Sequence, residues 1–441
     1  MKREFITIMA VAFAVVATAQ EKTGPDYGNF TVDAQVRAYG EYLEGTVTNG
    51  STEHVLSVNE RARFSLGWER KNVSMKITGQ HIGFWQKDTH KSTSGKFALH
   101  EAWAKLTFGK GFLAQVGRQE LAYDDERLLG AHDWVSSGRT HDALRLGWEN
   151  PWHKVHAIAG FNQTAEEPDP LSGDPTSKLY KNMEALWYHY GASQSPFQIS
   201  GIFINQGVND VWTDSIRYMQ TFGVYMTYEK SNITADASLY YQMGRDRTDK
   251  KTSAYMLSAN FGWQFLPQWK VSVGDDYLSG SDGMPGKNRT FNLLYGSYHN
   301  FLGDMDNFAY YSIPYYGLND AHARVDFNCC PKFDVTLAYH WFITGRPINN
   351  YLKDPIEPII DPAKILTMRK YHGKHRFSQN LGGEVDLQLS YRPWKNVTLQ
   401  AGFGMMISSE TMRFLRSIGK YQKWGWVGFN VNPTIFTTRR N

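Results

Sequence analysis

The sequence has very few cysteines and, beyond its first residues, no long apolar run. Its only two cysteines, Cys329 and Cys330, are adjacent, so the chain has neither a disulfide framework nor the ligand spacing of a zinc site. We interpret them as small residues at a strand end, and a strained vicinal disulfide is the alternative. No stretch after the N-terminus approaches the ~20 apolar residues that a membrane-spanning helix requires.

The chain also lacks a strong excess of charge of either sign. Its formal net charge is +4, which is too small to predict nucleic-acid binding. The histidines and acidic residues show no regular ligand spacing, so the sequence implies neither a bound metal nor a cofactor.

The first residues predict a cleaved signal peptide. Lys2 and Arg3 give a positive start, residues 5–16 are mostly apolar, and Ala17-Thr18-Ala19 has the small-x-small pattern of a cleavage site. We therefore expect a signal peptide over 1–19 and a single domain over 20–441.

Apolar and polar side chains alternate in many long segments, with no helix between them. In 56–68, one face carries Arg61 and Arg63, because a strand points successive side chains to opposite faces. Aromatic residues make up 15% of the chain. This combination is typical of a barrel with lipid outside and water inside. The apolar face of this segment consists of Leu56, Val58, Ala62, Phe64, Leu66 and Trp68.

Short and long connections alternate along the whole chain. Eight short breaks rich in turn residues lie at 70–72, 109–111, 150–152, 194–196, 230–232, 266–268, 330–332 and 393–396. Nine longer polar connections lie near 43–54, 87–96, 119–141, 163–180, 207–214, 244–252, 280–316, 343–378 and 408–423. Eight and nine connections together join eighteen strands, the last of them over 424–436. We predict an all-β fold, a transmembrane antiparallel up-and-down β-barrel with short periplasmic turns, long extracellular loops and room for an aqueous channel.

The alternation predicts which charged side chains face the lumen, because a charge on the lipid face costs a few kcal/mol at mid-membrane. The basic residues of this set are Arg37, Arg61, Arg63, Lys76, Lys105, Arg145, Arg217 and Arg324. The acidic residues are Asp33, Glu41, Glu101, Asp236, Asp326, Glu384 and Asp386. An arginine-rich wall would attract anions or carboxylates. The alternative, which the sequence leaves open, is that these charges pair across strands.

The densest motif lies within 117–146. It contains Gly117-Arg118-Gln119, Tyr123, Asp124-Asp125-Glu126-Arg127-Leu128-Leu129, Asp133-Trp134 and Gly138-Arg139-Thr140. Its acidic run would suit a cation but lacks the spacing of a calcium loop. A loop held by salt bridges through Arg127 and Arg139 is the simpler interpretation.

This motif resembles the signature of the alginate-export-type outer-membrane proteins. The segments 276–282, 299–306 and 381–387 support the resemblance, which spans most of the chain after the signal peptide. It implies an eighteen-stranded barrel whose pore, lined by arginines and acids, passes an anionic uronic-acid polymer. Carried over by position, the basic contacts are Arg118, Arg127, Arg139 and Arg145, the acidic ones are Asp124, Asp125, Glu126, Asp133 and Glu384, and Tyr123 and Trp134 complete the loop motif.

We therefore expect an outer-membrane channel for anionic or carboxylate-bearing solutes, and no enzyme. It would be a monomer that contacts lipid, lipopolysaccharide and an anionic solute or polysaccharide. The long connection 280–316 is a candidate gate, and the basic connection 343–378 would recruit polyanions or remain an ordinary solvated loop. The alternatives are a surface-binding barrel with a plugged lumen, or a barrel hydrolase that uses His132, Asp133, His141 and Asp142 at the rim.

Overall fold

The computed structural model describes residues 27–45, 54–85, 96–162, 180–213, 215–281, 286–308, 315–348, 378–416 and 418–439. The signal peptide predicted over 1–19 lies outside these residues. The first half of the wall consists of β1 (Asn29–Glu44), β2 (Val55–Arg70), β3 (Val73–Phe84), β4 (Lys96–Phe108), β5 (Phe112–Gln119), β6 (His141–Glu149), β7 (His153–Phe161), β8 (Asn182–Tyr190) and β9 (Phe197–Asn209). The second half consists of β10 (Ile216–Lys230), β11 (Ile233–Arg245), β12 (Lys251–Leu266), β13 (Trp269–Leu278), β15 (Leu318–Cys330), β16 (Phe333–Ile343), β17 (Asn380–Trp394), β18 (Val397–Ser408) and β19 (Tyr421–Val431).

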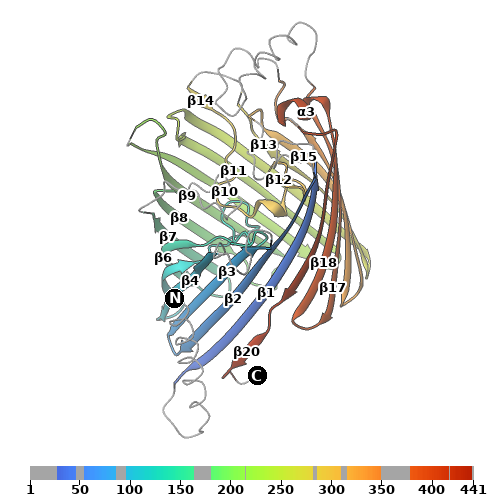
Figure 1. Cartoon of the computed structure of the whole chain (residues 1–441). Helices are drawn as coiled ribbons and strands as arrows, with labels where there is room; N and C mark the ends of the chain where they lie inside the picture. The colour runs from blue at the N-terminus through green and yellow to red at the C-terminus, as the bar shows by residue number, and fades with distance from the viewer. Residues whose placement is uncertain are drawn as a thin grey trace.

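These eighteen strands form a closed antiparallel ring. Each strand pairs with the next along the chain, and β1 pairs with β19 over Val36↔Val431 to Glu44↔Lys423, which closes the barrel. The short β14 (Lys287–Asn288) lies in the connection after β13 and pairs in parallel with β12, so β13 and β15 are neighbours in the wall. The strands run obliquely around the barrel (Figure 1). Closure leaves no open sheet edge, which a strand in lipid could not tolerate.

The predicted alternation of connections is confirmed. The eight short turns gather at one end of the barrel and the nine longer connections at the other, so the strand count of eighteen is confirmed as well. The helix α3 (Glu410–Arg416) belongs to the connection between β18 and β19. In the part of the chain that the structure describes, no helix is long and apolar enough to span a membrane.

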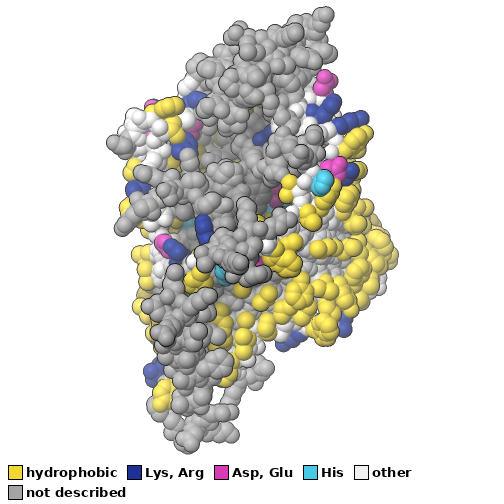
Figure 2. Space-filling model, viewed as in Figure 1, with side chains coloured by type: hydrophobic (Ala, Val, Ile, Leu, Met, Phe, Trp, Pro, Cys, Tyr) yellow, Lys and Arg dark blue, Asp and Glu magenta, His cyan; other side chains and the backbone are white. Residues whose placement is uncertain are grey.

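The two faces of the wall differ as the alternation predicts. On β16, the side chains of Leu337, Tyr339 and Trp341 are about half exposed on the outer face, whereas Phe342 beside them is buried inside. Figure 2 shows hydrophobic side chains over a broad area of the outer wall. An apolar outer band between polar ends is the arrangement that a lipid bilayer stabilises.

Two strands depart from simple alternation. The pairing of β4 with β3 shifts between Thr78 and Gly79, and this bulge turns both His100 and Glu101 inward. The last strand, predicted as continuous over 424–436, is split into β19 and β20 (Thr434–Thr437), both paired with β1. The break falls at Pro433, which has no N–H to donate to a ladder. Cys329 and Cys330 are exposed free thiols at the end of β15, so the disulfide alternative is wrong.

The hydrophobic core lies inside the barrel rather than between layers. Segments 120–140 and 286–308, which belong to two long connections, run within the ring of strands (Figure 1). Leu121, Leu129 and Phe308 in these segments are almost fully buried, and they belong to one cluster with inward apolar side chains of β8, β9 and β12. The lumen is therefore narrowed by folded loops, a feature that the sequence left open for 280–316 and did not predict for 120–140.

Candidate pore constriction

Three arginines converge on Asp133 and its backbone inside the barrel. Arg61 on β2 binds Asp133 in a bidentate way, with Nη1–Oδ1 and Nη2–Oδ2 distances of 2.8 and 3.0 Å. Arg63 donates to the same Oδ1 at 2.8 Å. Arg37 on β1 donates to the backbone oxygens of Asp133 and Trp134 at 2.7 and 2.9 Å. We call Arg37, Arg61 and Arg63 the arginine cluster.

The strand pattern explains why the arginine cluster exists. Arg37 and Arg61 are directly paired across β1 and β2, and Arg63 lies two residues further on the same face. Like charges so close repel, and the single carboxylate of Asp133 offsets only part of that repulsion. Gln35 and Gln80 orient the guanidinium groups by accepting from Arg61 and Arg63 at 2.9 and 2.8 Å.

Asp133 remains ionised because of these neighbours. Burial raises the pKa of its carboxyl, but Arg61, Arg63 and Arg37 together lower it further, to about 2. Half of its side chain stays exposed to the lumen, whereas the side chain of Arg61 is fully buried. Among direct contacts, three guanidinium groups meet one carboxylate, so the contacts themselves leave an excess of positive charge, while Glu120 acts on Arg63 from further away.

Trp134 fixes the position of Asp133 through aromatic contacts. Its ring stacks on His299 with centroids 3.8 Å apart and planes at 9°. It also meets the edges of Tyr39 and Trp426 at 4.8 and 5.2 Å. Burial lowers the pKa of His299, but the nearby Asp306, at 3.0 Å, outweighs this and raises it above its ordinary value. Segment 120–140 thus presents Asp133 to the arginine cluster, and His299 of segment 286–308 packs against Trp134 and supports it.

The two lumen segments are joined along their backbones. Leu129 and Tyr295 form an isolated parallel bridge, and Ser297 donates both its backbone N–H and its hydroxyl to Glu126, at 2.8 and 2.5 Å. A Cβ on Gly296 would lie 2.2 Å from the backbone oxygen of Arg127, so only glycine permits this approach. Arg139 adds a hydrogen bond of 2.8 Å to the backbone oxygen of Gly296.

Arg127 anchors segment 120–140 to the far wall. It is buried, and it contacts Asp125 at 2.7 Å and Asp276 of β13 at 2.9 Å. Its guanidinium lies over the ring of Phe301, 3.9 Å from the centroid. Burial raises the pKa of Asp125 to about 6, and Arg127 opposes that rise. Arg127 thus forms the salt bridges that the sequence predicted for this loop, whereas Arg139 binds the loop through the backbone oxygen of Gly296.

The acidic run of the motif does not come together around a common point. Asp124 accepts from Trp187 at 3.0 Å, while Glu126 accepts from Ser297 and from the backbone of Ala131. Tyr123 forms a hydrogen bond of 2.9 Å with His156 of the wall. Because these side chains diverge toward separate protein partners, they offer no shared cation site.

Acidic side chains lie on another part of the wall, around β17. Glu384 accepts from the backbone N–H of Met305 at 2.9 Å, so it holds segment 286–308 in place. Asp386 is also buried, and Gln388 donates to Asp304 of the same segment. The lumen is therefore basic at β1 and β2 and acidic at β17.

The other predicted lumen residues have varied surroundings. Arg145 donates to Gln115 at 2.6 Å and lines, with Lys105, a pocket of about 370 Å³ near the turn at 109–111. Three others are paired: Lys76 with Glu101, Arg217 with Asp210 and Asp249, and Arg324 with Asp326. Cross-strand and loop pairing thus accounts for part of the wall, but the arginine cluster stays undercompensated.

Arg118 does not line the lumen. It shares the outer face of β5 with Val116 and forms a bidentate pair with Asp142 of β6, at 2.9 and 2.8 Å. His141, next to Asp142, faces inward and contacts Tyr180 at 3.0 Å. Of the residues considered for a hydrolase, His141 and Asp142 therefore lie on opposite faces of the wall.

Sequence reasoning missed the supporting residues of the constriction. Gln35 and Gln80 share the lumen parity of the arginines, so the alternation could have included them. His299 could not have been placed, because nothing in the sequence indicates that two distant loops meet. Most of the basic connection 343–378 lies outside the described residues.

The comparisons with known proteins agree with this architecture. The family model described as alginate export matches residues 59–170 and 175–414. The chain belongs to the alginate export family. It is therefore an outer-membrane barrel of a family of channels rather than of enzymes. No curated protein matches it in sequence.

Solved proteins of Pseudomonas aeruginosa share the fold of this alginate export family member. OccK2 (OpdF), solved in complex with glucuronate, superposes with a TM-score of 0.61 at 13% identity, covering 92% of this chain and 97% of that one. OprD superposes with a TM-score of 0.60 at 10% identity, covering 92% and 94%. OccK9 (OpdG) superposes with a TM-score of 0.60 at 11% identity, covering 91% of this chain and 98% of that one. At such identities the likeness establishes the fold alone.

Proposed function

We propose that this barrel is a passive channel for anionic, carboxylate-bearing solutes, with uronates and their oligomers as the substrate class. The arginine cluster is the observation that carries the proposal. Arginine binds carboxylates through two parallel hydrogen bonds, and Arg61 already binds Asp133 in that way. A solute carboxylate could bind Arg37 and Arg63, because Asp133 neutralises only part of their positive charge.

The acidic stretch of wall around β17, which is joined to β1 through β18 and β19, supports the same proposal. A transverse field between basic and acidic walls orients a solute that carries both a carboxylate and hydroxyl groups. Lys105 and Arg145, which line the pocket near the short turns, continue the positive side toward the periplasm. The family to which the chain belongs and the glucuronate bound to OccK2 point to uronates as the first solutes to test.

The proposal predicts selective block of ion current by uronate oligomers. In a planar bilayer with purified protein, glucuronate oligomers should reduce the conductance at concentrations where neutral glucose oligomers of equal length have no effect. Replacing Arg37 and Arg63 with glutamine removes two charge-assisted contacts, each contributing roughly 1.5–3 kcal/mol. The concentration for half-block should then rise by about tenfold or more.

A matched control removes two arginines of the outer surface, in the double variant R118Q/R245Q. Arg118 and Arg245 are exposed at the outer ends of β5 and β11 and pair with Asp142 and Asp249. The control should keep the half-block concentration of the wild type. Equal block by neutral oligomers, or unchanged block in R37Q/R63Q, would contradict the proposal.

A further inference from the structure

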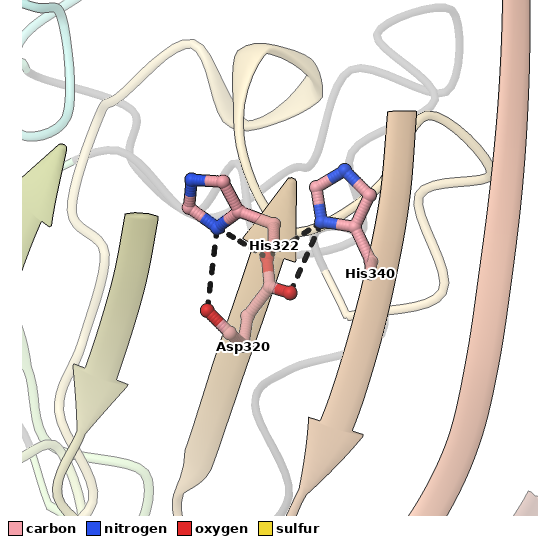
Figure 3. Close-up of side chains that lie close together, drawn as sticks. All are labelled: Asp320, His322 and His340. Carbon is pink, nitrogen blue, oxygen red and sulfur yellow. Dashed lines mark hydrogen bonds and ion pairs between the residues drawn. The ribbon is translucent and has the colours of Figure 1, made fainter. Parts of the chain in front are cut away.

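A second polar cluster lies on the lumen wall, away from the arginine cluster. His322 of β15 and His340 of β16 are directly paired across the two strands, and Asp320 lies two residues before His322 on the same face. His340 Nδ1 is 3.0 and 2.9 Å from the two oxygens of Asp320, and His322 Nδ1 is 3.7 Å from Oδ2. One ligand atom from each residue lies within 4.8 Å of the other two (Figure 3).

The outer nitrogen of His322 is oriented by a hydrogen-bond relay. The amide nitrogen of Asn260 donates to Asp236 at 2.8 Å, which leaves its carbonyl oxygen 2.9 Å from His322 Nε2. Nε2 is therefore positioned to donate to Asn260, and Nδ1 lies on the side of Asp320, 3.3 Å from its backbone oxygen and 3.7 Å from Oδ2. A metal ion on Nδ1 would replace the contact with that backbone oxygen. Histidines that bind metals are typically held in this way, with the second N–H donated to a fixed acceptor.

His340 faces a second buried carboxyl group with its other nitrogen, at a distance longer than a hydrogen bond. Its Nε2 is 4.0 Å from an oxygen of Asp386, which is 2% exposed. Neither carboxylate oxygen of Asp386 has a hydrogen-bond partner among the described residues. An unpartnered carboxylate so deeply buried is costly unless a positive charge lies nearby.

The surrounding wall carries more buried carboxyl groups than buried basic side chains. Four carboxyl groups, each on a residue no more than 2% exposed, come from three strands of this part of the wall, and they are Asp276, Asp320, Glu384 and Asp386. β13 pairs with β15, and β16, which carries His340, lies between β15 and β17. In the described part of the chain, Arg127 is the guanidinium that pairs with this group, through Asp276. A bound dication would offset this excess of carboxyl groups.

We propose that Nδ1 of His322, Nδ1 of His340 and the carboxylate of Asp320 bind one divalent first-row transition metal ion of the Zn²⁺ type. Metal–ligand bonds of ~2.0–2.2 Å place tetrahedral ligand atoms about 3.4 Å apart. The distances of 2.9 and 3.7 Å lie on either side of that value. Water would complete the coordination, because both histidine side chains are partly exposed to the lumen, by 19% and 13%.

The metal would tie β15 to β16 beside the residue that holds a lumen loop. Glu384 is paired with His340 across β16 and β17, and it accepts from Met305. The ion would therefore stiffen the wall on which segment 286–308 rests. This role is independent of which solute the channel passes.

Calorimetric titration of chelator-treated, purified protein with Zn²⁺ tests the proposal, and Co²⁺ absorption in the visible range reports the ligand geometry. We expect the wild type to bind one equivalent of Zn²⁺ with high affinity. H322A and H340A should each weaken it at least tenfold. D320N, which preserves the shape of the side chain, should do the same. Retained heat-modifiable migration in electrophoresis shows that each variant is folded.

Two control variants separate this site from incidental histidine binding. H189A removes a lumen histidine of β8 that contacts Ser200, and H372A/H375A removes a pair in the connection 343–378. Both should keep the high-affinity equivalent. No stoichiometric Zn²⁺ binding by the wild type, or equal affinity in H322A and H340A, would overturn the proposal and leave a proton as the shared cation of this cluster.

Discussion

At the scale of single residues, one carboxylate organises the positive side of the constriction. Asp133 accepts from Arg61 and Arg63 and carries one of the two backbone oxygens to which Arg37 donates. The alternation of β1 and β2 predicted that these arginines face the lumen. The alternation could not predict that these arginines share Asp133, because Asp133 lies on a loop 70 residues after Arg63 in the chain.

We expect D133N to loosen segment 120–140. Charge-assisted hydrogen bonds contribute roughly 1.5–3 kcal/mol each, so local opening at pH 7 should become about tenfold more frequent or more. Amide hydrogen exchange of peptides from 121–139 measures this directly. R324Q, which breaks a pair on β15, is the control and should leave those peptides unchanged. Equal exchange in D133N and wild type would contradict the role of Asp133.

The same contact has a defined pH dependence. The folded-state pKa of Asp133, about 2, is below that of an unfolded aspartate, near 3.9. Its contribution to stability is therefore present above pH ~4 and is lost as the pH falls through 2. Protection of 121–139 that depends on Asp133 should thus remain constant from pH 7 to 5.

The predicted placement of Arg118 shows a limit of arguing from a motif. The resemblance made it a pore contact, yet the strand it occupies places it beside Val116 on the outer face. Strand parity was the better guide here, because the position of a side chain in a β-barrel follows from the pleat.

At the scale of elements, the barrel wall was predictable and the lumen was not. Turn residues mark the hairpins locally, and alternation assigns their faces, so each strand can be placed from its own sequence. The packing of 120–140 against 286–308 depends on contacts between residues far apart in the chain. The long connection 280–316 was predicted as a candidate gate, and its residues 286–308 pack inside the barrel.

We expect G296A to separate the two lumen segments. The added methyl would overlap the backbone oxygen of Arg127, and overpacking of this kind costs typically about 1–3 kcal/mol. Amide exchange should rise in both 121–139 and 290–305, since each segment supports the other. The control is G425A, where a Cβ meets no atom within 4 Å. Faster exchange in one segment only would contradict their mutual support.

At the scale of the whole molecule, the chain combines a wide barrel with a narrow interior. Eighteen strands enclose enough space for an aqueous channel, and the two segments fill part of it with a hydrophobic core. Positive charge gathers at β1 and β2 and negative charge at β13 to β17. This division is visible in the sequence, because neighbouring strands in such a barrel are neighbours in the chain.

The most direct test of the central claim is the reversal potential of the purified protein in a planar bilayer under a potassium chloride gradient. The arginine cluster predicts a stable conductance with a reversal potential displaced toward that of chloride, and R37Q/R63Q should move it toward zero. A reversal potential at zero or displaced toward that of potassium would contradict an anion-selective constriction, as would folded protein that does not conduct.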